Sequence, residues 1–168
     1  MNKCGVNIVG GVASLVMALL TVASLMLLAT PSRAADAYAS GIERGRYLVR
    51  FGGCNDCHTP GYGLAGGKVD ESRWLVGDSV GWQGAWGTTF PINLRMFVSQ
   101  MTEDQWVQVT RKSQARPPMP AWVFNEISEQ DLRAIYRYIR SLGAAGQPAP
   151  AYLPPGAATA LPVVVYPQ

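Results

Sequence analysis

The clearest alternation of apolar and polar positions lies between Ser128 and Gly143. Apolar side chains recur there at i, i+3, i+4, i+7 and i+10, which places them on one face of a helix. That stripe consists of Leu132, Ile135, Tyr136, Ile139 and Leu142. Ser128 with Asp131 three positions later is an N-cap pattern, and Gly143 suits the position after a last turn. The pattern predicts a helix that begins after Ser128 and ends before Gly143.

Two more helices are predicted upstream. Apolar positions in residues 38–51 indicate a short helix that runs into the sequence "GGCNDCH". Thr102 followed by Gln105 is a capping-box pattern, and we expect that helix to end before Pro117. Residues 60–94 are rich in Gly and Trp and lack helical periodicity, so they are predicted to form an ordered loop.

The chain divides into three parts by composition. No residue from Gly5 to Pro31 is charged, Lys3 precedes this run, and small residues follow it. This layout is typical of an export signal, and the apolar run is also long enough to cross a bilayer. We therefore expect residues 1–34 to be a signal peptide or a retained membrane anchor, 38–143 a folded domain, and 144–168 a Pro/Ala-rich tail that is extended or disordered.

Composition excludes several classes of protein. Three cysteines do not make a disulfide framework. The formal net charge is +3, and no basic cluster is longer than the pair Arg111-Lys112, so no nucleic acid is expected as a partner. If residues 1–34 are removed, Lys3 and Arg33 leave, and 14 − 2 = 12 basic residues face 11 acidic ones. The folded unit is predicted to be all-α, and three short helices enclose little core without a further group at the centre.

The motif that supplies candidate chemistry is Cys54, Cys57 and His58, in which the histidine is the single one of the chain. A thioredoxin-like redox site needs a βαβ context, and no strand pattern surrounds these residues. A structural zinc site needs four ligands, and three adjacent ones are poorly placed to close a tetrahedron. Without any bound group, two thiols would be exposed in an oxidising compartment. Attachment of a haem accounts for the spacing, for the neighbouring histidine and for the missing core.

Four segments together resemble a class I cytochrome c. They are "CNDCHTPG" at 54–61, "AGG" at 65–67, "PPMPAW" at 117–122 and "SEQDLRAIYRYIRSLG" at 128–143. Over about residues 42–143 the chain is most similar to the haem c domains of cytochrome subunits that serve bacterial membrane-bound dehydrogenases. Those subunits usually carry three attachment motifs, and this chain has one. The resemblance implies a small class I cytochrome c fold, with three to four short helices and loops wrapped around one covalently bound haem c.

The predicted haem ligands are four residues. Cys54 and Cys57 would form the thioethers, and His58 would be one axial ligand of the iron. Met119 is predicted as the other axial ligand, because flanking prolines stiffen its backbone and because it follows His58 by 61 residues, far enough to wrap round a haem. The resemblance points to the same methionine. Met96 and Met101 are better explained as core methionines.

Three expectations concern the surroundings of these ligands and the packing of the helices. The second ring nitrogen of His58 should donate to a main-chain carbonyl, with Pro60 or a glycine within 61–67 as candidates. The haem propionates are expected to accept hydrogen bonds from side chains with N–H donors. The candidates are Trp82, Trp86, Asn93 and Arg95. Finally, the first helix should cross the last one with Gly45 against the face that carries Tyr136.

The function predicted from these residues is electron transfer, with no catalytic residues. Two protein ligands on the iron leave no open position for a substrate, which favours a carrier over an enzyme. We expect a periplasmic protein that exchanges electrons with redox proteins. If the N-terminal apolar segment is retained, it would also associate the protein with the membrane. A dehydrogenase or quinol-linked donor and a terminal oxidase or other acceptor are the predicted partners, and a fixed subunit of a dehydrogenase is a variant. The alternative is a haem sensor or peroxidase-like protein with a labile sixth site, although the chain lacks a second histidine for acid/base work.

Overall fold

The computed structural model describes residues 30–167, with side-chain surroundings from residue 37 onward. The chain divides into two compact units, Met1–Ala39 and Ser40–Gln168. The predicted signal or anchor at 1–34 lies outside the described residues except for its last five positions. None of the described helices has the length and apolar character needed to cross a membrane.

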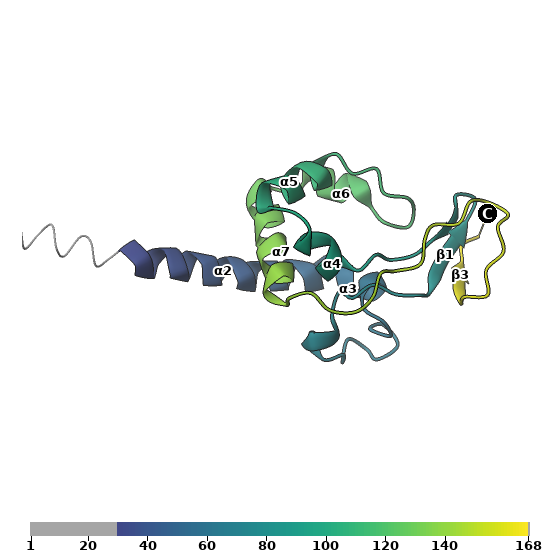
Figure 1. The fold of residues 1–168 in the computed structure, drawn as a ribbon, viewed down its shortest axis with the longest axis horizontal. Coiled ribbons are helices and arrows are strands. Elements are labelled where there is room, and N and C mark those ends of the chain that lie inside the picture. Colours follow the sequence, from purple (N-terminus) through teal and green to yellow (C-terminus); the bar gives the residue numbers. More distant parts are fainter. Residues whose placement is uncertain (1–29, 168) are drawn as a thin grey trace, which may run out of the picture. The chain divides into compact units, whose positions relative to one another are not determined.

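The described part of the chain is mostly helical, as predicted, and also contains a small sheet (Figure 1). The helices are α2 (Thr30–Phe51), α3 (Cys54–His58), the 3-10 helix η1 (Glu71–Arg73), α4 (Leu94–Ser99), α5 (Glu103–Arg111), α6 (Ala121–Glu126) and α7 (Glu129–Ser141). The strands are β1 (Gly81–Gly84), β2 (Gly87–Thr89) and β3 (Val163–Val165).

Both predicted helix caps are present. The Ser128 hydroxyl accepts a hydrogen bond of 3.1 Å from the Asp131 N–H at the start of α7. At the start of α5, the Thr102 hydroxyl accepts from the Gln105 N–H and the Gln105 side chain accepts from the Thr102 N–H, which completes the capping box. The chain leaves α7 at Gly143 with φ of 71°, in the left-handed region that glycine tolerates. Local sequence therefore determines where these two helices begin.

Helix α7 supplies more buried hydrophobic side chains to the core than any other described element. Its buried side chains are Leu132, Ala134, Ile135, Tyr138 and Ile139. Helix α2 crosses it at Gly45, where a Cβ atom would collide with the Ala134 carbonyl and would lie 2.7 Å from the Cβ of Tyr138. The predicted close crossing is confirmed, but the predicted face of α7 is wrong. Gly45 meets Ala134 and Tyr138, whereas the Tyr136 hydroxyl donates to the Met101 carbonyl.

The crossing of α2 and α7 is braced by charged groups. The Tyr138 hydroxyl donates to a carboxylate oxygen of Glu71 at 2.7 Å, and the Arg46 guanidinium donates to both oxygens of the same carboxylate. The Arg46 bonds are the main cause of a lowered pKa at Glu71. Burial and the nearby Glu71 carboxylate together raise the pKa of Tyr138.

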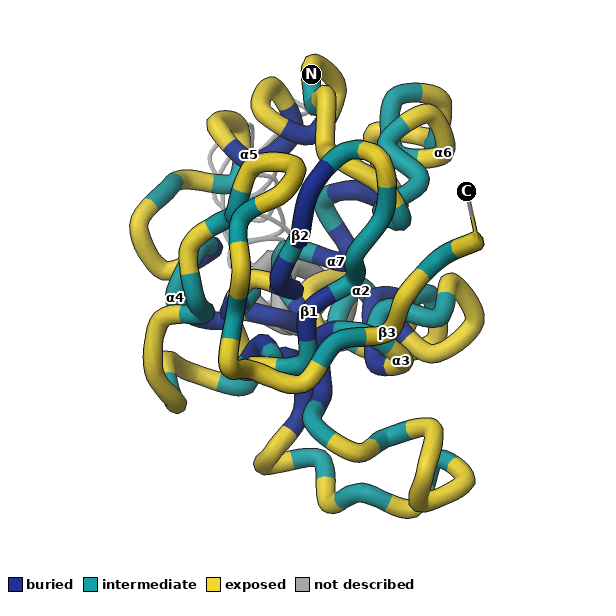
Figure 2. Tube along the Cα trace, turned by 90° about the vertical axis from the view of Figure 1, so that its right-hand side faces the viewer, coloured by how far each residue is buried: buried dark blue, intermediate teal, exposed yellow. Residues whose placement is uncertain are grey.

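Residues 60–94 are ordered, as predicted, but they are not only loop. Trp74 is buried and its indole N–H donates to the Val69 carbonyl. Strands β1 and β2 form an antiparallel hairpin that periodicity does not reveal, because each strand has only three or four residues and contains glycine. The segment of residues 60–73 is largely exposed and forms the lower lobe of Figure 2.

The C-terminal tail folds back on the domain. Strand β3 pairs in parallel with β1, which gives the strand order β2-β1-β3. Leu153 forms an antiparallel bridge with Thr88 of β2. In Figure 1 the tail accordingly runs beside β1, and β3 lies next to that strand. Of the two predicted states of the tail, the structure shows the extended one, held by main-chain hydrogen bonds.

Candidate haem-binding site

The attachment motif occupies a short helix directly after α2. Gly53 has φ of 68°, a left-handed conformation that lets the chain turn from the end of α2 into α3. Within α3, Cys54 and Cys57 are three positions apart and belong to the same turn. Both thiols are free, and both line one pocket.

His58 is held at the end of α3 by contacts with two other segments. Its side chain is buried, and Nδ1 lies 2.7 Å from the Ile92 carbonyl oxygen, so Nδ1 carries the proton and donates it. The other ring nitrogen, Nε2, is thereby left without a proton and is free to bind a metal ion. Burial lowers the pKa of His58, against the opposing effect of the Ile92 bond. The imidazole is therefore neutral, as a metal ligand must be.

The acceptor for His58 was predicted among Pro60 and residues 61–67, and this prediction is wrong. The main chain folds so that a later segment supplies the carbonyl. The His58 carbonyl accepts from the Gly77 N–H, and the neighbouring Asp78 N–H donates to the Pro91 carbonyl. These two bonds bring Ile92 next to the imidazole. Local sequence patterns cannot predict a partner so far along the chain.

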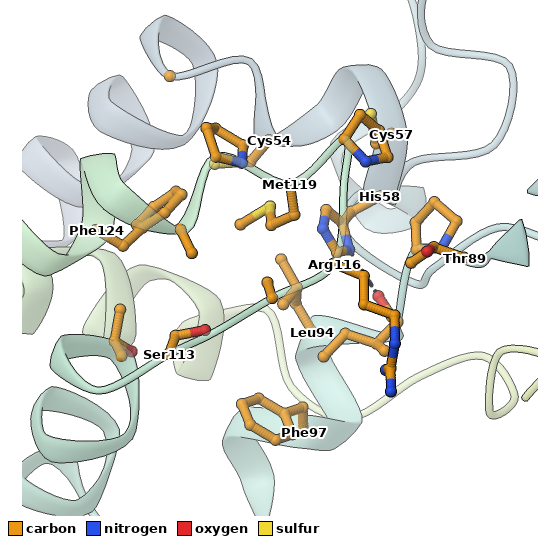
Figure 3. A pocket seen from close by; sticks show the side chains of 18 of the residues that line it. Cys54, Cys57, His58, Thr89, Leu94, Phe97, Ser113, Arg116, Met119 and Phe124 are labelled. Atoms are coloured by element: carbon orange, nitrogen blue, oxygen red, sulfur yellow. Dashed lines mark hydrogen bonds between the residues drawn. The ribbon is translucent and has the colours of Figure 1, made fainter. Parts of the chain in front are cut away.

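A cavity of about 440 Å³ lies beside the motif (Figure 3), within the range of ligand pockets, roughly 300–1,000 Å³. Cys54, Cys57 and His58 line it, and so does Met119 from the loop between α5 and α6. Most of the remaining lining is apolar. It includes Trp82, Phe90, Leu94, Phe97, Trp106, Val109, Phe124, Ile135 and Ile139. A large apolar macrocycle with two covalent anchors and two axial ligands fits this set of residues.

Neither thiol has the lowered pKa that is typical of redox cysteines. Removal from water raises the pKa of the Cys54 thiol to about 11, and it also raises the pKa of Cys57. Reactive cysteines of disulfide-exchange motifs have the opposite property, a lowered pKa. The helix–loop surroundings, without the βαβ unit of a thioredoxin fold, agree with this.

Met119, the predicted ligand, and the two predicted core methionines occupy different places. Met119 lines the cavity, and neither Met96 nor Met101 does. Met101 packs at the edge of the hydrophobic core, and the Met96 N–H donates to the Asn93 side chain in the first turn of α4. The geometry therefore favours Met119 among the three.

Two of the four candidate propionate partners have other tasks. The Asn93 side chain caps α4 and donates to the carbonyls of Ala145 and Gln147. Arg95 is buried, and its guanidinium donates to three main-chain carbonyls, those of Ser72, Leu142 and Gly143. Because both side chains hold the fold and neither lines the cavity, the structure does not favour them as propionate partners. Trp82 lines the cavity and Trp86 does not.

Thr89 is a candidate that sequence reasoning missed. Its hydroxyl is buried without a hydrogen-bond partner, and the residue lines the cavity. A buried hydroxyl without a partner costs free energy, so a polar group of the bound molecule is expected to reach it. Only the β1–β2 hairpin brings Thr89 to this wall, and no local signal in "WGTTFP" distinguishes it from Thr88.

Comparison with known proteins decides the family. The family model for cytochrome c matches residues 42–143. The chain belongs to the cytochrome c family. Cytochromes c carry covalently bound haem c and serve in electron transfer, so membership of the family supports haem-based electron transfer.

A relative among characterised proteins covers only a short segment. A "Diheme cytochrome c-type" protein of Cereibacter sphaeroides is 61% identical over 36 residues. That segment is 21% of this cytochrome c and 12% of the relative, so the chain spans only a small part of the relative's length. No solved structure matches the chain significantly.

Proposed function

We propose that this cytochrome c is a one-haem electron carrier with His58 and Met119 as axial ligands and with Cys54 and Cys57 as thioether anchors. The observation that carries the proposal is that all four side chains line one apolar cavity. The bond from His58 Nδ1 to the Ile92 carbonyl supports it, because that bond leaves Nε2 as the ligand atom. The single Cys-x-x-Cys-His run of the sequence supports one haem.

The residues of the site explain why a carrier is favoured. A bound haem iron supplies a reversible one-electron couple. If His58 and Met119 hold the iron, this ligand pair would raise its reduction potential, and the soft thioether of Met119 would favour the ferrous state. With both residues bound, the iron would offer substrates and oxygen no open position. The apolar lining excludes water, which reduces the solvent rearrangement that accompanies electron transfer.

We also propose a location and a division of the chain. Residues 1–34 act as an export signal or membrane anchor, 38–143 form the cytochrome domain, and 144–168 form a tail. The charge-free apolar run after Lys3 supports export, and attachment of haem c takes place outside the cytoplasm. A periplasmic protein of this kind would receive electrons from a dehydrogenase or quinol-linked donor and would pass them to a terminal oxidase or other acceptor.

The experiment that tests the proposal is the visible spectrum of the purified holoprotein, oxidised and reduced, with and without carbon monoxide. We expect a low-spin ferrous c-type spectrum that does not change promptly when carbon monoxide is added, and a weak red ferric band of sulfur–iron ligation. Met119→Ala should abolish that band and lower the potential, whereas Met96→Ala should leave both unchanged. Rapid binding of carbon monoxide by the unmodified protein would overturn the carrier proposal in favour of a sensor or peroxidase-like protein.

A further inference from the structure

The loop that carries Met119 has few bonds to the rest of the domain. The Met119 N–H donates to the Arg116 carbonyl, and the Met119 carbonyl accepts from Ala121, so both contacts are local. At the start of the loop, the Asn125 side chain donates to the Ser113 carbonyl at 3.4 Å. In the described chain, residues 114–118 make hydrogen bonds only within the loop. Main-chain bonding alone therefore does not determine how this loop sits over the cavity.

A side-chain contact ties the loop to the C-terminal tail. The guanidinium carbon of Arg116 lies 3.8 Å from the centre of the Tyr152 ring, well within the range of a cation–π contact, about 6 Å. Arg116 also lines the cavity, three residues before Met119. Tyr152 belongs to the tail, beyond residues 42–143 that match the cytochrome c family.

The Tyr152 ring is itself fixed to the wall of the cavity. Its hydroxyl donates to the Trp86 carbonyl at 2.8 Å. The next residue, Leu153, exchanges two main-chain hydrogen bonds with Thr88, of 2.8 and 3.0 Å. Trp86 and Thr88 belong to the β1–β2 hairpin, whose Thr89 lines the cavity. The ring is therefore a rigid platform, and the loop is the element that it restrains.

The tail reaches the cavity at two further places. Near the start of the tail, the carbonyls of Ala145 and Gln147 accept hydrogen bonds from the Asn93 side chain. Asn93 directly follows Ile92, whose carbonyl accepts from His58. Near its end, Tyr166 lines the cavity, with its ring centre 5.9 Å from that of Trp82. The tail thus connects the histidine side of the site with the methionine side.

We propose that Tyr152 is a positioning residue for the sixth ligand: its ring holds Arg116 and so keeps the Met119 loop closed over the cavity. This inference rests on the proposed ligation of the iron by Met119. Loss of one exposed cation–π contact should raise the population of the released loop roughly two- to five-fold. Carbon monoxide binds ferrous iron only when Met119 has left, so its binding rate reports that population.

The test is a double-mutant cycle on the full-length holoprotein, with stopped-flow binding of carbon monoxide to the ferrous state. Tyr152→Leu and Arg116→Gln should each accelerate binding roughly two- to five-fold, and the double variant should be no faster than the faster single one. Tyr152→Phe keeps the ring and should stay within about two-fold of the unmodified protein. Unchanged rates in Tyr152→Leu, or effects that multiply in the double variant, would overturn the inference.

Two controls separate the possible failures. Tyr136→Phe removes a hydroxyl contact at the α7 face and reports the effect of a general loss of stability. If it accelerates binding as much as Tyr152→Leu does, the role of Tyr152 is only structural and the inference fails. Met119→Ala tests the premise. If that variant keeps the red ferric band, the proposed ligand is wrong. If Met119→Ala opens the iron but Tyr152→Leu binds carbon monoxide at the unmodified rate, only the positioning role of Tyr152 is refuted.

Discussion

The crossing of α2 and α7 at Gly45 allows a quantitative prediction. A Cβ atom at this position would lie 2.6 Å from the carbonyl carbon of Ala134 and 2.7 Å from the Cβ of Tyr138, below the 3.0 Å that real Cβ atoms keep. The obstructing atoms belong mostly to the main chain of α7, and that helix is held by a fully buried face. Relief therefore requires movement of a whole helix and cannot come from rotation of a side chain.

Two opposing effects determine how much Gly45→Ala changes the free energy of unfolding. Replacement of glycine by alanine inside a helix gains about 1 kcal/mol of helix propensity. Overpacking of a core typically costs about 1–3 kcal/mol, occasionally more, and a clash with main chain belongs at the upper end. We expect a net loss of about 2 kcal/mol in the free energy of unfolding, which corresponds to a Tm lower by roughly 6–12 °C for a domain of this size.

Gly41→Ala is the matched control on the same helix. A Cβ there would lie 3.3 Å from an Arg137 nitrogen, the mobile end of a long side chain, so the propensity gain should remain. The assay is thermal unfolding of the two holoproteins followed by far-ultraviolet circular dichroism, at equal haem content. Gly41→Ala should match or slightly exceed the unmodified protein in stability. If Gly45→Ala unfolds at the same temperature as Gly41→Ala, the close crossing is refuted.

Three further predictions concern the remaining polar contacts. Because the Arg46 bond lowers the Glu71 pKa from 4.5, the stabilisation by Glu71 is complete above that pH and is lost as the pH falls below it. The difference in denaturation midpoint between Glu71→Gln and the unmodified protein should therefore shrink on acidification, and a pH-independent difference would contradict this. Arg95→Met leaves three main-chain carbonyls without their donor and should cost about 3 kcal/mol or more in guanidinium unfolding, whereas a loss under 1 kcal/mol would show that water replaces the side chain. Trp106→Phe removes the buried bond to the Leu132 carbonyl and should cost about 1–3 kcal/mol in the same assay, and an unchanged midpoint would contradict this.

Sequence reasoning worked best where chemistry is local. The caps at Thr102 and Ser128, the apolar stripe of α7 and the stop at Gly143 each depend on side chains within a few positions. It failed for α6, for the two-strand hairpin and for the acceptor of His58. Short elements carry too few positions for periodicity, and tertiary packing decides whether they form.

By itself, the sequence determined the chemistry of this cytochrome c. Residue type and spacing at Cys54, Cys57 and His58 indicate covalent haem attachment, and the flanking prolines select Met119 as the candidate ligand. Only the tertiary structure decided which groups surround those residues. The Ile92 carbonyl, the Thr89 hydroxyl and the Tyr152 ring lie 34, 31 and 94 positions from His58 in the chain. Hydrogen bonds between distant main-chain segments bring them to the site, and such pairings depend on the packing of the whole domain.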